Sequence, residues 1–403
     1  MSGRTTGVRD ARARGRRALV VLAAVLALVG PLAVPASAAD PSSGNVPAQR
    51  RATGEQRWGD GSYLDGHRYL RGVNVYSLIF GGSRGPGAVG ESQRSYDFLA
   101  GRGVDVVRLP VAWGQLQPVP SRGGPRAGLD RPVSQEYLDV VETQVARAAR
   151  AGIRTVIDLH NACSYPDWQA TPGSLTCGSG ITEDDVRRVW GTIARRFARD
   201  ERVLAYDLFN ETELRLGVEV YKRYTQVATQ AIRAQGAEQT VWVQRMLGAR
   251  GRLADIAPDG PWVRDHLGKV MYSQHFYLGP TDATFDPFAG NHAVLEDLQR
   301  FGDWCRRWRV RCVVGEVGWP SGGRGGVQSE ASGRGWNLVF EQFYRSADAY
   351  GLDVTYFAAS SHRRPATLLA YVASRPGYPS PSGLDTALSQ ARVIEAHPSR
   401  RAG

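Results

Sequence analysis

The chain has 403 residues, of which 42% are hydrophobic and 22% charged, a composition that excludes a disordered, collagen-like or multi-span membrane protein. A chain of this length can bury one barrel-sized core or two ordinary domains. Its formal charge of +11 suggests a nucleic-acid partner, but six Arg against one Asp in the first 39 residues leave 11 − 5 = +6 on the remainder. Because the rest of the chain carries no basic-aromatic recognition motif, we expect no nucleic-acid partner.

The N-terminus has the three parts of a secretory signal peptide. Residues 1–17 are basic, residues 18–30 form an unbroken apolar run, and Ala36-Ser37-Ala38 is a small-residue cleavage site. A spanning helix needs about 20 apolar residues, so an uncleaved anchor is the less favoured alternative. The pair Arg16-Arg17 leaves both general and twin-arginine export open.

We therefore predict a secreted, extracellular protein with cleavage near Ala38 and no stable membrane span. The predicted division of the chain is a signal peptide over 1–38, a flexible leader over 39–57 and one catalytic domain over 58–403.

The four cysteines fit an exported protein. Cys163 and Cys177 are 14 residues apart, Cys305 and Cys312 are seven apart, and neither pair has the C-x2-C spacing of a zinc site. In an oxidising compartment two local disulfides are the favoured state, and buried free thiols are the alternative.

After residue 60, eight short runs rich in β-branched and aromatic residues have the near-continuous apolar character of strands buried on both faces. These predicted strands cover 69–77, 104–110, 154–160, 203–210, 240–245, 270–276, 312–316 and 353–358.

Helix-length amphipathic segments separate most of these runs. Apolar residues at helical spacing over 138–148, 186–197 and 294–304 predict three of the helices, while 250–260 allows only a short one. A last helical segment is expected over 384–397. Eight strands mostly separated by helices predict an α/β fold, a single-domain (β/α)8 TIM barrel with loop insertions. A doubly wound open sheet is the structural alternative.

In such a barrel the functional residues lie at the C-terminal ends of the strands. Polar and ionisable side chains occur there repeatedly after otherwise apolar strands. They are Arg108, His160, Asn210, Glu211, His275, Tyr277 and Glu316.

Two carboxylates that face each other across a barrel mouth suit glycoside hydrolysis, in which one donates a proton and the other attacks the anomeric carbon. Glu211 and Glu316 follow strands on opposite sides of the mouth and can converge. Arg108 would favour the charged form of Glu316, and Tyr277 could donate a hydrogen bond to it. Asn210 offers an amide to a sugar 2-hydroxyl.

These residues, read with their neighbours, resemble glycoside hydrolase family 5, the cellulase family of a larger clan of retaining (β/α)8 enzymes. The motifs that carry the resemblance are VVRLP with Arg108, DLH with His160, FNE with Asn210 and Glu211, HFY with His275 and Tyr277, and VVGEVGWP with Glu316. The resemblance covers about residues 60–360. It implies that Glu211 is the general acid/base, that Glu316 is the nucleophile, and that the other residues support them.

The resemblance is incomplete at the eighth strand, where the family usually has a Trp beneath the sugar and this chain reads VTYFAASSH. Tyr356, Phe357 or a Trp from another loop would have to replace it. Aromatic faces bind sugars, and Trp113, Trp168 and Trp319 follow three strands at the expected rim, so they are candidate platforms, with simple packing as the alternative.

Two further motifs do not change this interpretation. Residues 85–90 match G-x-G-x-x-G but come several residues after the first strand, so they favour a glycine-rich rim loop over a dinucleotide site. Asn210-Glu211-Thr212 is formally a glycosylation sequon, but a glycan there would block the expected site. We expect no cofactor and no metal.

The sequence thus predicts a secreted retaining glycoside hydrolase that hydrolyses a β-linked polysaccharide or oligosaccharide and acts as a monomer. Two alternatives remain. One is a secreted, non-catalytic carbohydrate-binding barrel. The other is a related clan glycosidase for mannan, β-1,3-glucan or glycolipid, since the GEVGWPSG stretch is similar to plant-type β-1,3-glucanases.

Overall fold

The computed structural model describes residues 62–80, 90–166, 173–278, 280–362, 367–375 and 383–402. The predicted signal peptide and leader, the G-x-G-x-x-G loop up to residue 89, and Trp168 lie outside the described residues. Within the described ranges, no helix combines the length and apolar character needed to cross a membrane.

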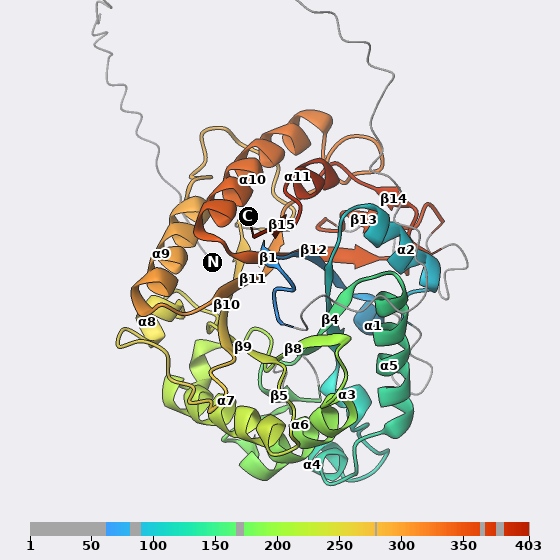
Figure 1. The fold of residues 1–403 in the computed structure, drawn as a ribbon, viewed down its shortest axis with the longest axis vertical. Coiled ribbons are helices and arrows are strands. Elements are labelled where there is room, and N and C mark those ends of the chain that lie inside the picture. Colours follow the sequence, from blue (N-terminus) through green and yellow to red (C-terminus); the bar gives the residue numbers. More distant parts are fainter. Residues whose placement is uncertain are drawn as a thin grey trace, which may run out of the picture. The chain divides into compact units, whose positions relative to one another are not determined.

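Eight parallel strands form the centre of the fold (Figure 1). They are β2 (Arg71–Val75), β3 (Val106–Val111), β4 (Arg154–Leu159), β8 (Val203–Asp207), β9 (Thr240–Gln244), β10 (Val270–Tyr277), β11 (Cys312–Gly318) and β12 (Asp353–Ser360). Each pairs with the next, and β12 returns to pair with β2, which closes the sheet. The eight predicted runs match these strands, so the predicted (β/α)8 barrel is confirmed and the open-sheet alternative is excluded.

Helices surround this ring of strands in Figure 1. They are α1 (Ser77–Phe80), α2 (Gln93–Gly101), α3 (Trp113–Leu116), α4 (Gly124–Leu129), α5 (Gln135–Arg150), α6 (Glu183–Phe197), α7 (Val218–Arg233), α8 (Leu253–Ile256), α9 (Ala293–Trp308), α10 (Glu330–Tyr350) and α11 (Ala391–Ala396), with a 3-10 turn at Leu214–Leu216. The predicted helices over 138–148, 186–197 and 294–304 are confirmed, and α8 is as short as expected.

Short strands complete the fold. They are β1 (His67–Tyr69) with β15 (Arg400–Arg401), β5 (Ser164–Tyr165) with β6 (Leu175–Cys177) and β7 (Gly180–Ile181), and β13 (Tyr371–Val372) with β14 (Thr386–Ala387). The last pair corrects one prediction: the helix expected over 384–397 covers only 391–396. The preceding residues pair with β13 in the main sheet, so their backbone groups are already committed to strand hydrogen bonds.

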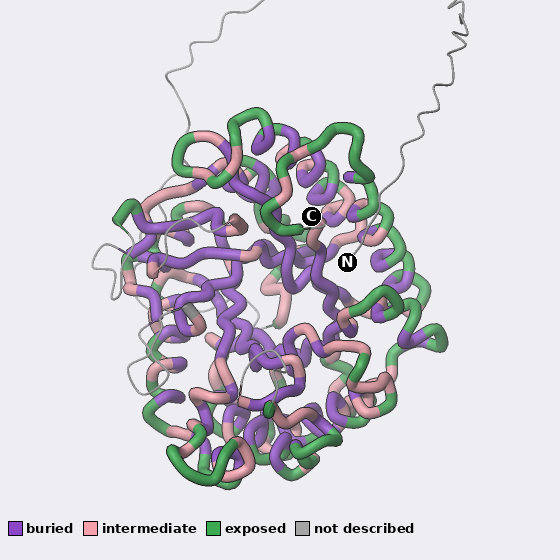
Figure 2. The backbone as a smooth tube through the Cα atoms, turned by 180° about the vertical axis from the view of Figure 1, so that it is seen from behind, coloured by how far each residue is buried: buried purple, intermediate pink, exposed green. Residues whose placement is uncertain are grey.

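The central strands are buried along most of their length (Figure 2), and the alternation of their side chains gives two apolar layers. Val106, Val156, Trp242 and Met271 belong to a small cluster with Val313, which fills the barrel interior below the polar residues. The other strand residues pack against the surrounding helices in a much larger cluster. The polar residues described below lie beyond this apolar cluster, toward the C-terminal ends of the strands.

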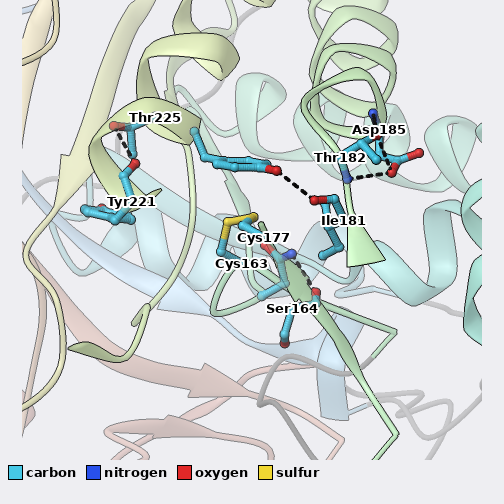
Figure 3. The surroundings of a disulfide bond; sticks show 10 residues. Cys163, Ser164, Cys177, Ile181, Thr182, Asp185, Tyr221 and Thr225 are labelled. Carbon is cyan, nitrogen blue, oxygen red and sulfur yellow. Dashed lines mark hydrogen bonds between the residues drawn. A yellow bond between two sulfur atoms is a disulfide. The ribbon is translucent and has the colours of Figure 1, made fainter. Parts of the chain in front are cut away.

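Both predicted cysteine pairs are disulfides. Cys163 and Cys177 have Cα atoms 5.5 Å apart, and Cys305 and Cys312 have Cα atoms 6.2 Å apart. Figure 3 shows the first bond beside Ile181 of β7, which precedes the N-cap of α6, Thr182. It closes a loop that begins three residues after His160 at the end of β4, and loop-closure entropy makes such a bond worth about 3 kcal/mol. This disulfide therefore fixes the segment that follows one of the predicted site residues.

A histidine near the C-terminus gives the fold a dependence on pH. His397 donates from Nδ1 to Asp348 Oδ2 at 2.7 Å, and its Nε2 lies 3.3 Å from Glu341 Oε1. The hydrogen bond to Asp348 raises the pKa of His397. A raised folded-state pKa stabilises the fold at pH values below the unfolded-state pKa of about 6.5, and this contribution is lost as the pH rises through the folded-state value.

We expect His397→Gln to lower the free energy of unfolding at about pH 6 and to have little effect at about pH 9, because the charged imidazole contributes only at the lower pH. Denaturant titrations of the wild type and the variant at both pH values measure this change in the free energy of unfolding. His266, whose side chain is 71% exposed, provides the matched control His266→Gln, for which no such pattern is expected. An equal loss at both pH values would contradict a role for the charge.

Candidate active site

Six of the seven predicted site residues lie near or just beyond the C-terminal ends of four barrel strands, and Arg108 lies within β3. Glu211 and Tyr277 are partly buried, and the other five are buried. The seven are Arg108, His160, Asn210, Glu211, His275, Tyr277 and Glu316. The hydrogen bonds and ion pairs described next join them into one network.

Arg108 is the centre of this network and is fully buried. Its Nη1 donates to Glu316 Oε1 at 2.7 Å and to Asn74 Oδ1 at 2.8 Å, and its Nη2 donates to Asn210 Oδ1 at 2.8 Å. One guanidinium therefore orients a carboxylate from β11 and an amide that follows β8. Its planar fork of donors suits this task, whereas a Lys ammonium would not fix both geometries.

Two buried aspartates accompany this guanidinium. Asp207 Oδ2 accepts from Arg108 Nε at 2.8 Å, and Asp158 Oδ2 lies 3.0 Å from Arg108 Nη2. Burial opposes the charge on Arg108, but the carboxylates of Asp158, Asp207 and Glu316 outweigh it and raise the pKa of the guanidinium. Arg108 therefore stays charged, and in return it stabilises three carboxylates in a site from which water is largely excluded.

A β-bulge turns Glu316 into the barrel. Along β11, Val313 faces the barrel interior and Val314 faces the helices, so strict alternation would point residue 316 outward. The pairing with β10 moves from Gln274–Val314 to His275–Glu316, which skips Gly315 and restores the inward direction at Glu316. A Cβ at Gly315 would lie 2.5 Å from Ser273 Oγ and 2.9 Å from His275 Nε2, so only glycine fits.

Glu211 follows β8 in a left-handed backbone conformation, with φ of 52°. Its backbone N–H donates to Gln244 Oε1 at 3.0 Å, and its Oε1 lies 3.0 Å from Nδ1 of His275. Its side chain is 22% exposed, compared with 4% for Glu316. Burial raises the pKa of Glu211, although the charges of Arg108 and neighbouring residues oppose this. Glu211 is thus the more accessible of the two carboxyls and the one suited to hold a proton.

The two glutamates lie close together but have different partners. One oxygen of Glu211, one oxygen of Glu316 and a nitrogen of His275 all lie within 4.8 Å of one another. Both oxygens of Glu316 accept hydrogen bonds, Oε1 from Arg108 and Oε2 from the hydroxyl of Tyr277. Burial beside Glu316 and Glu211 raises the pKa of Tyr277 well above its ordinary value, so this phenol keeps its proton and donates it. Glu316 is thus the carboxyl that accepts hydrogen bonds on both oxygens, and Glu211 is the carboxyl whose pKa burial raises.

The same three residues could in principle offer ligands to a metal ion, but their surroundings do not favour one. Glu316 already accepts hydrogen bonds from Arg108 and Tyr277. The guanidinium charge, 2.7 Å from its carboxylate, would oppose a divalent cation at the same place. The donor set therefore suits proton transfer and nucleophilic attack.

Both histidines of the site are neutral. Burial lowers the pKa of His160 to about 4, and burial likewise lowers the pKa of His275 to about 4. His160 Nδ1 lies 2.7 Å from Asp158 Oδ2, and its Nε2 lies 2.7 Å from the hydroxyl of Tyr76. Its Nε2 is also 3.4 Å from Nδ2 of Asn210. Asp158 thus orients an imidazole that in turn contacts the amide beside Glu211.

Five residues of this network are not among those predicted from the sequence. They are Asn74, Tyr76, Asp158, Asp207 and Gln244. A signal was present, because each lies at or near the C-terminal end of a strand in phase with a known inward residue: Asp158, for example, is two positions before His160. Polar residues at the inward positions of otherwise apolar strands are therefore the sequence signal that indicates these site residues.

The tryptophans expected at the rim are placed differently. Trp113 and Trp319 are 0% and 1% exposed. Trp113 packs edge-on against Tyr165, and Trp319 stacks on Phe340 with ring centroids 4.3 Å apart. Both indoles are therefore part of the core, which corrects the expectation that they offer open platforms. Trp113 is the first residue of α3, and the partner of Trp319, Phe340, lies on α10.

Phe357 occupies the inward position at the end of β12, where it pairs with Asn74 of β2. It is only partly buried, and its ring lies edge-on to those of Tyr76 and Tyr277, with centroids 4.9 Å and 6.3 Å away. Tyr356 instead faces outward, is fully buried and donates to the carbonyl of Leu368. Of the aromatic residues on this strand, Phe357 is the one beside the catalytic candidates.

Comparisons with known proteins find one matching family and several relatives. The family model described as "Cellulase (glycosyl hydrolase family 5)" matches residues 72–363. A region of 158 residues is 27% identical to Endoglucanase B of Acetivibrio thermocellus and covers 35% of this chain. A region of 130 residues is 25% identical to a protein of Aspergillus niger described as "Probable glucan 1,3-beta-glucosidase A" and covers 32% of this chain. These regions span only 24% and 29% of the two relatives' own lengths.

Among solved structures, the endoglucanase Cel5A of Pseudomonas stutzeri in complex with cellobiose matches with a TM-score of 0.65 at 16% identity. The match covers 81% of this chain and 92% of that one. At this identity the match shows a shared fold.

Proposed function

The chain belongs to the cellulase family, glycosyl hydrolase family 5, and is a glycosidase; we propose that it cleaves β-linked glucan with retention of configuration, using Glu211 and Glu316. The observation that carries this proposal is the proximity of the two carboxyls, which have oxygens within 4.8 Å of each other. Retaining glycosidases have carboxyl groups about 5–5.5 Å apart, whereas inverting enzymes need about 6.5–9.5 Å to admit a water molecule.

In the first half-reaction, Glu316 attacks the anomeric carbon while Glu211 donates its proton to the leaving glycosidic oxygen. The bond between the anomeric carbon and that oxygen breaks, and a glycosyl ester forms on Glu316. In the second half-reaction, Glu211 takes a proton from water, whose oxygen attacks the anomeric carbon. The ester bond breaks, and both glutamates return to their starting protonation states.

The surrounding network supports both half-reactions. Arg108 and Tyr277 bind the carboxylate of Glu316 in its attacking position and stabilise it again when the ester breaks. Asn210 is fixed through its Oδ1 by Arg108, which leaves its amide hydrogens for His160 and for a sugar hydroxyl. A hydrogen bond to the 2-hydroxyl strengthens as positive charge develops on the sugar.

The names of the similar proteins support a β-glucan substrate but differ in linkage, since they include endoglucanases and a 1,3-β-glucosidase. The direct test is a product profile over β-1,4-glucan, β-1,3-glucan, mannan, xylan and a glucosyl lipid. We expect soluble oligosaccharides from a β-glucan. Binding without hydrolysis of any of these would instead support a non-catalytic carbohydrate-binding barrel, an alternative that the intact pair of glutamates disfavours.

We further propose that the enzyme acts outside the cytosol, as its two disulfides suggest. N-terminal sequencing of protein collected from the culture medium should then begin just after Ala38. Recovery of the full-length N-terminus in the cell pellet would contradict export.

Phe357 is proposed as the floor of the cleavage subsite, in the place where the family usually has a Trp. We expect Phe357→Ala to lower kcat/KM on β-glucan by about 10–100-fold, since one lost sugar-stacking face and the repacking of Tyr76 and Tyr277 together are worth roughly 1.4–3 kcal/mol. Phe357→Trp should retain or raise activity.

Steady-state kinetics on soluble β-glucan measures kcat/KM for the Phe357 variants. Phe288 is 96% exposed, so Phe288→Ala is the matched control. Equal, small losses in the two alanine variants would refute the assignment of Phe357.

A further inference from the structure

The imidazole of His275 has one nitrogen in the active site and the other in a buried layer beneath it. Nδ1 lies 3.0 Å from Glu211 Oε1 and 3.5 Å from Glu316 Oε2. Nε2 is buried, and within the described part of the chain it has no hydrogen-bond partner. A neutral imidazole has one donor and one acceptor nitrogen, so the groups that face each nitrogen decide the tautomer.

The proposed reaction needs the tautomer with the proton on Nδ1. This N–H can donate to Oε1 of Glu211 both when that residue is an acid and when it is a carboxylate. The catalytic proton then stays on the other oxygen, toward the leaving group. The opposite tautomer would direct a lone pair at the oxygens of Glu211 and Glu316, which would repel them when charged and draw the proton of Glu211 away from the substrate.

For Nδ1 to carry the proton, Nε2 must accept a hydrogen bond. Ser273 lies two residues earlier on β10, so its side chain points into the barrel on the same side as His275. It is 0% exposed, and its Oγ, like Nε2, has no partner among the described residues. Both atoms face one point, since a Cβ on Gly315 would be 2.5 Å from Ser273 Oγ and 2.9 Å from His275 Nε2.

We propose that Ser273 is a positioning residue whose hydroxyl donates to Nε2 of His275, directly or through one water molecule, and thereby holds the proton on Nδ1 toward Glu211. Its effect on catalysis rests on the proposed function, whereas its effect on the tautomer does not. Because Gly315 has no side chain, it leaves room for the contact between Ser273 and His275.

The proposal predicts a direction for the pH profile. A donor at Nδ1 stabilises the charged form of Glu211, so losing it should move the basic limb of kcat/KM to higher pH. The other groups around His275 stay in place in a Ser273 variant, so they cannot cause the shift. They are Arg108, Asp207, Glu211, Arg245, Tyr277 and Glu316.

The test compares wild type, Ser273→Ala and Ser273→Thr, with Thr155→Val as a control. Thr155 also has a buried hydroxyl without a partner within the described residues, but it pairs with Val107, a residue that faces the helices. With ¹⁵N-labelled histidine, the nitrogen shifts of each imidazole show which nitrogen carries the proton. We expect the His275 signals to report Nδ1–H in wild type and Ser273→Thr, and a mixed or reversed state in Ser273→Ala.

Kinetics on β-glucan provides the second readout. We expect kcat/KM to fall about fivefold to tenfold in Ser273→Ala, the factor that one hydrogen bond is worth in a rate, together with the shift of the basic limb. Ser273→Thr and Thr155→Val should behave as wild type. An unchanged tautomer in Ser273→Ala overturns the proposal whatever the kinetics show. If wild type itself hydrolyses no glycan, the proposed function fails, and the nitrogen shifts still decide the role of Ser273.

Discussion

Replacing Glu316 by Ala is expected to lower kcat on β-glucan by roughly 10⁴-fold or more, the scale on which loss of a nucleophile stops an enzyme. The physical reason is that no other group can take its place. The carboxylate is directed inward by the bulge at Gly315 and is held by Arg108 and Tyr277 on its two oxygens. An alanine leaves nothing to form the glycosyl ester.

Two controls separate chemistry from folding. Glu330, whose side chain is 77% exposed on α10 and pairs with Arg334, gives the matched variant Glu330→Ala, which should keep wild-type kinetics. Thermal unfolding should show that Glu316→Ala remains folded, because Arg108 keeps its bonds to Asp207, Asn74 and Asn210. Wild-type turnover by Glu316→Ala would rule out its assignment as the nucleophile.

Replacing Glu211 by Ala is expected to have an effect that depends on the substrate. Hydrolysis of β-glucan should fall about 10²–10⁴-fold, because the leaving sugar oxygen needs a proton. An aryl β-glycoside with an acidic phenol as leaving group needs no such proton, so its first half-reaction should stay fast. Its glycosyl ester on Glu316 should then accumulate, because no base activates water. A burst of phenol followed by a slow steady rate is the expected result.

Azide sharpens this test. As a small nucleophile that needs no base, it should restore turnover of the aryl glycoside by Glu211→Ala and yield the β-glycosyl azide. The same addition to Glu316→Ala should yield the α-azide, since there the azide would attack from the side that Glu316 occupied. If Glu211→Ala lost activity equally on both substrate types and azide had no effect, Glu211 would not be the acid/base.

The dependence of kcat/KM on pH should also depend on Glu211. Because burial raises the pKa of Glu211, its proton is retained to higher pH than in an ordinary glutamic acid. We expect kcat/KM to fall as the pH rises through that pKa, and this basic limb should disappear for the aryl glycoside in Glu211→Ala.

The strands could be predicted from the sequence because both of their faces are buried, which makes each a continuous apolar run with a clear end. The polar residues that follow those runs were equally visible, and they include His160, Glu211 and Glu316. Phe357 was one of three options for the missing strand-eight Trp, and only the register of β12 with β2 distinguishes it from Tyr356.

Other features depend on three-dimensional detail that a pattern does not carry. The bulge at Gly315 inverts the inward and outward alternation of β11, and nothing in the local sequence marks it before the pairing with β10 is known. Trp113 and Trp319 follow strands as rim residues would, but tertiary packing against Tyr165 and Phe340 places them in the core. Asp158 and Asp207 are polar residues within apolar strands, and their function becomes clear only when Arg108 lies between them.

The central claim is that Glu211 and Glu316 act by double displacement, and the configuration of the first-formed product tests it most directly. Proton NMR during rapid hydrolysis of a soluble β-glucan oligosaccharide distinguishes the two anomers of the new reducing end before they equilibrate. We expect the β-anomer to form first and the α-anomer to grow in later by mutarotation. Initial formation of the α-anomer would show inversion and would contradict the central claim.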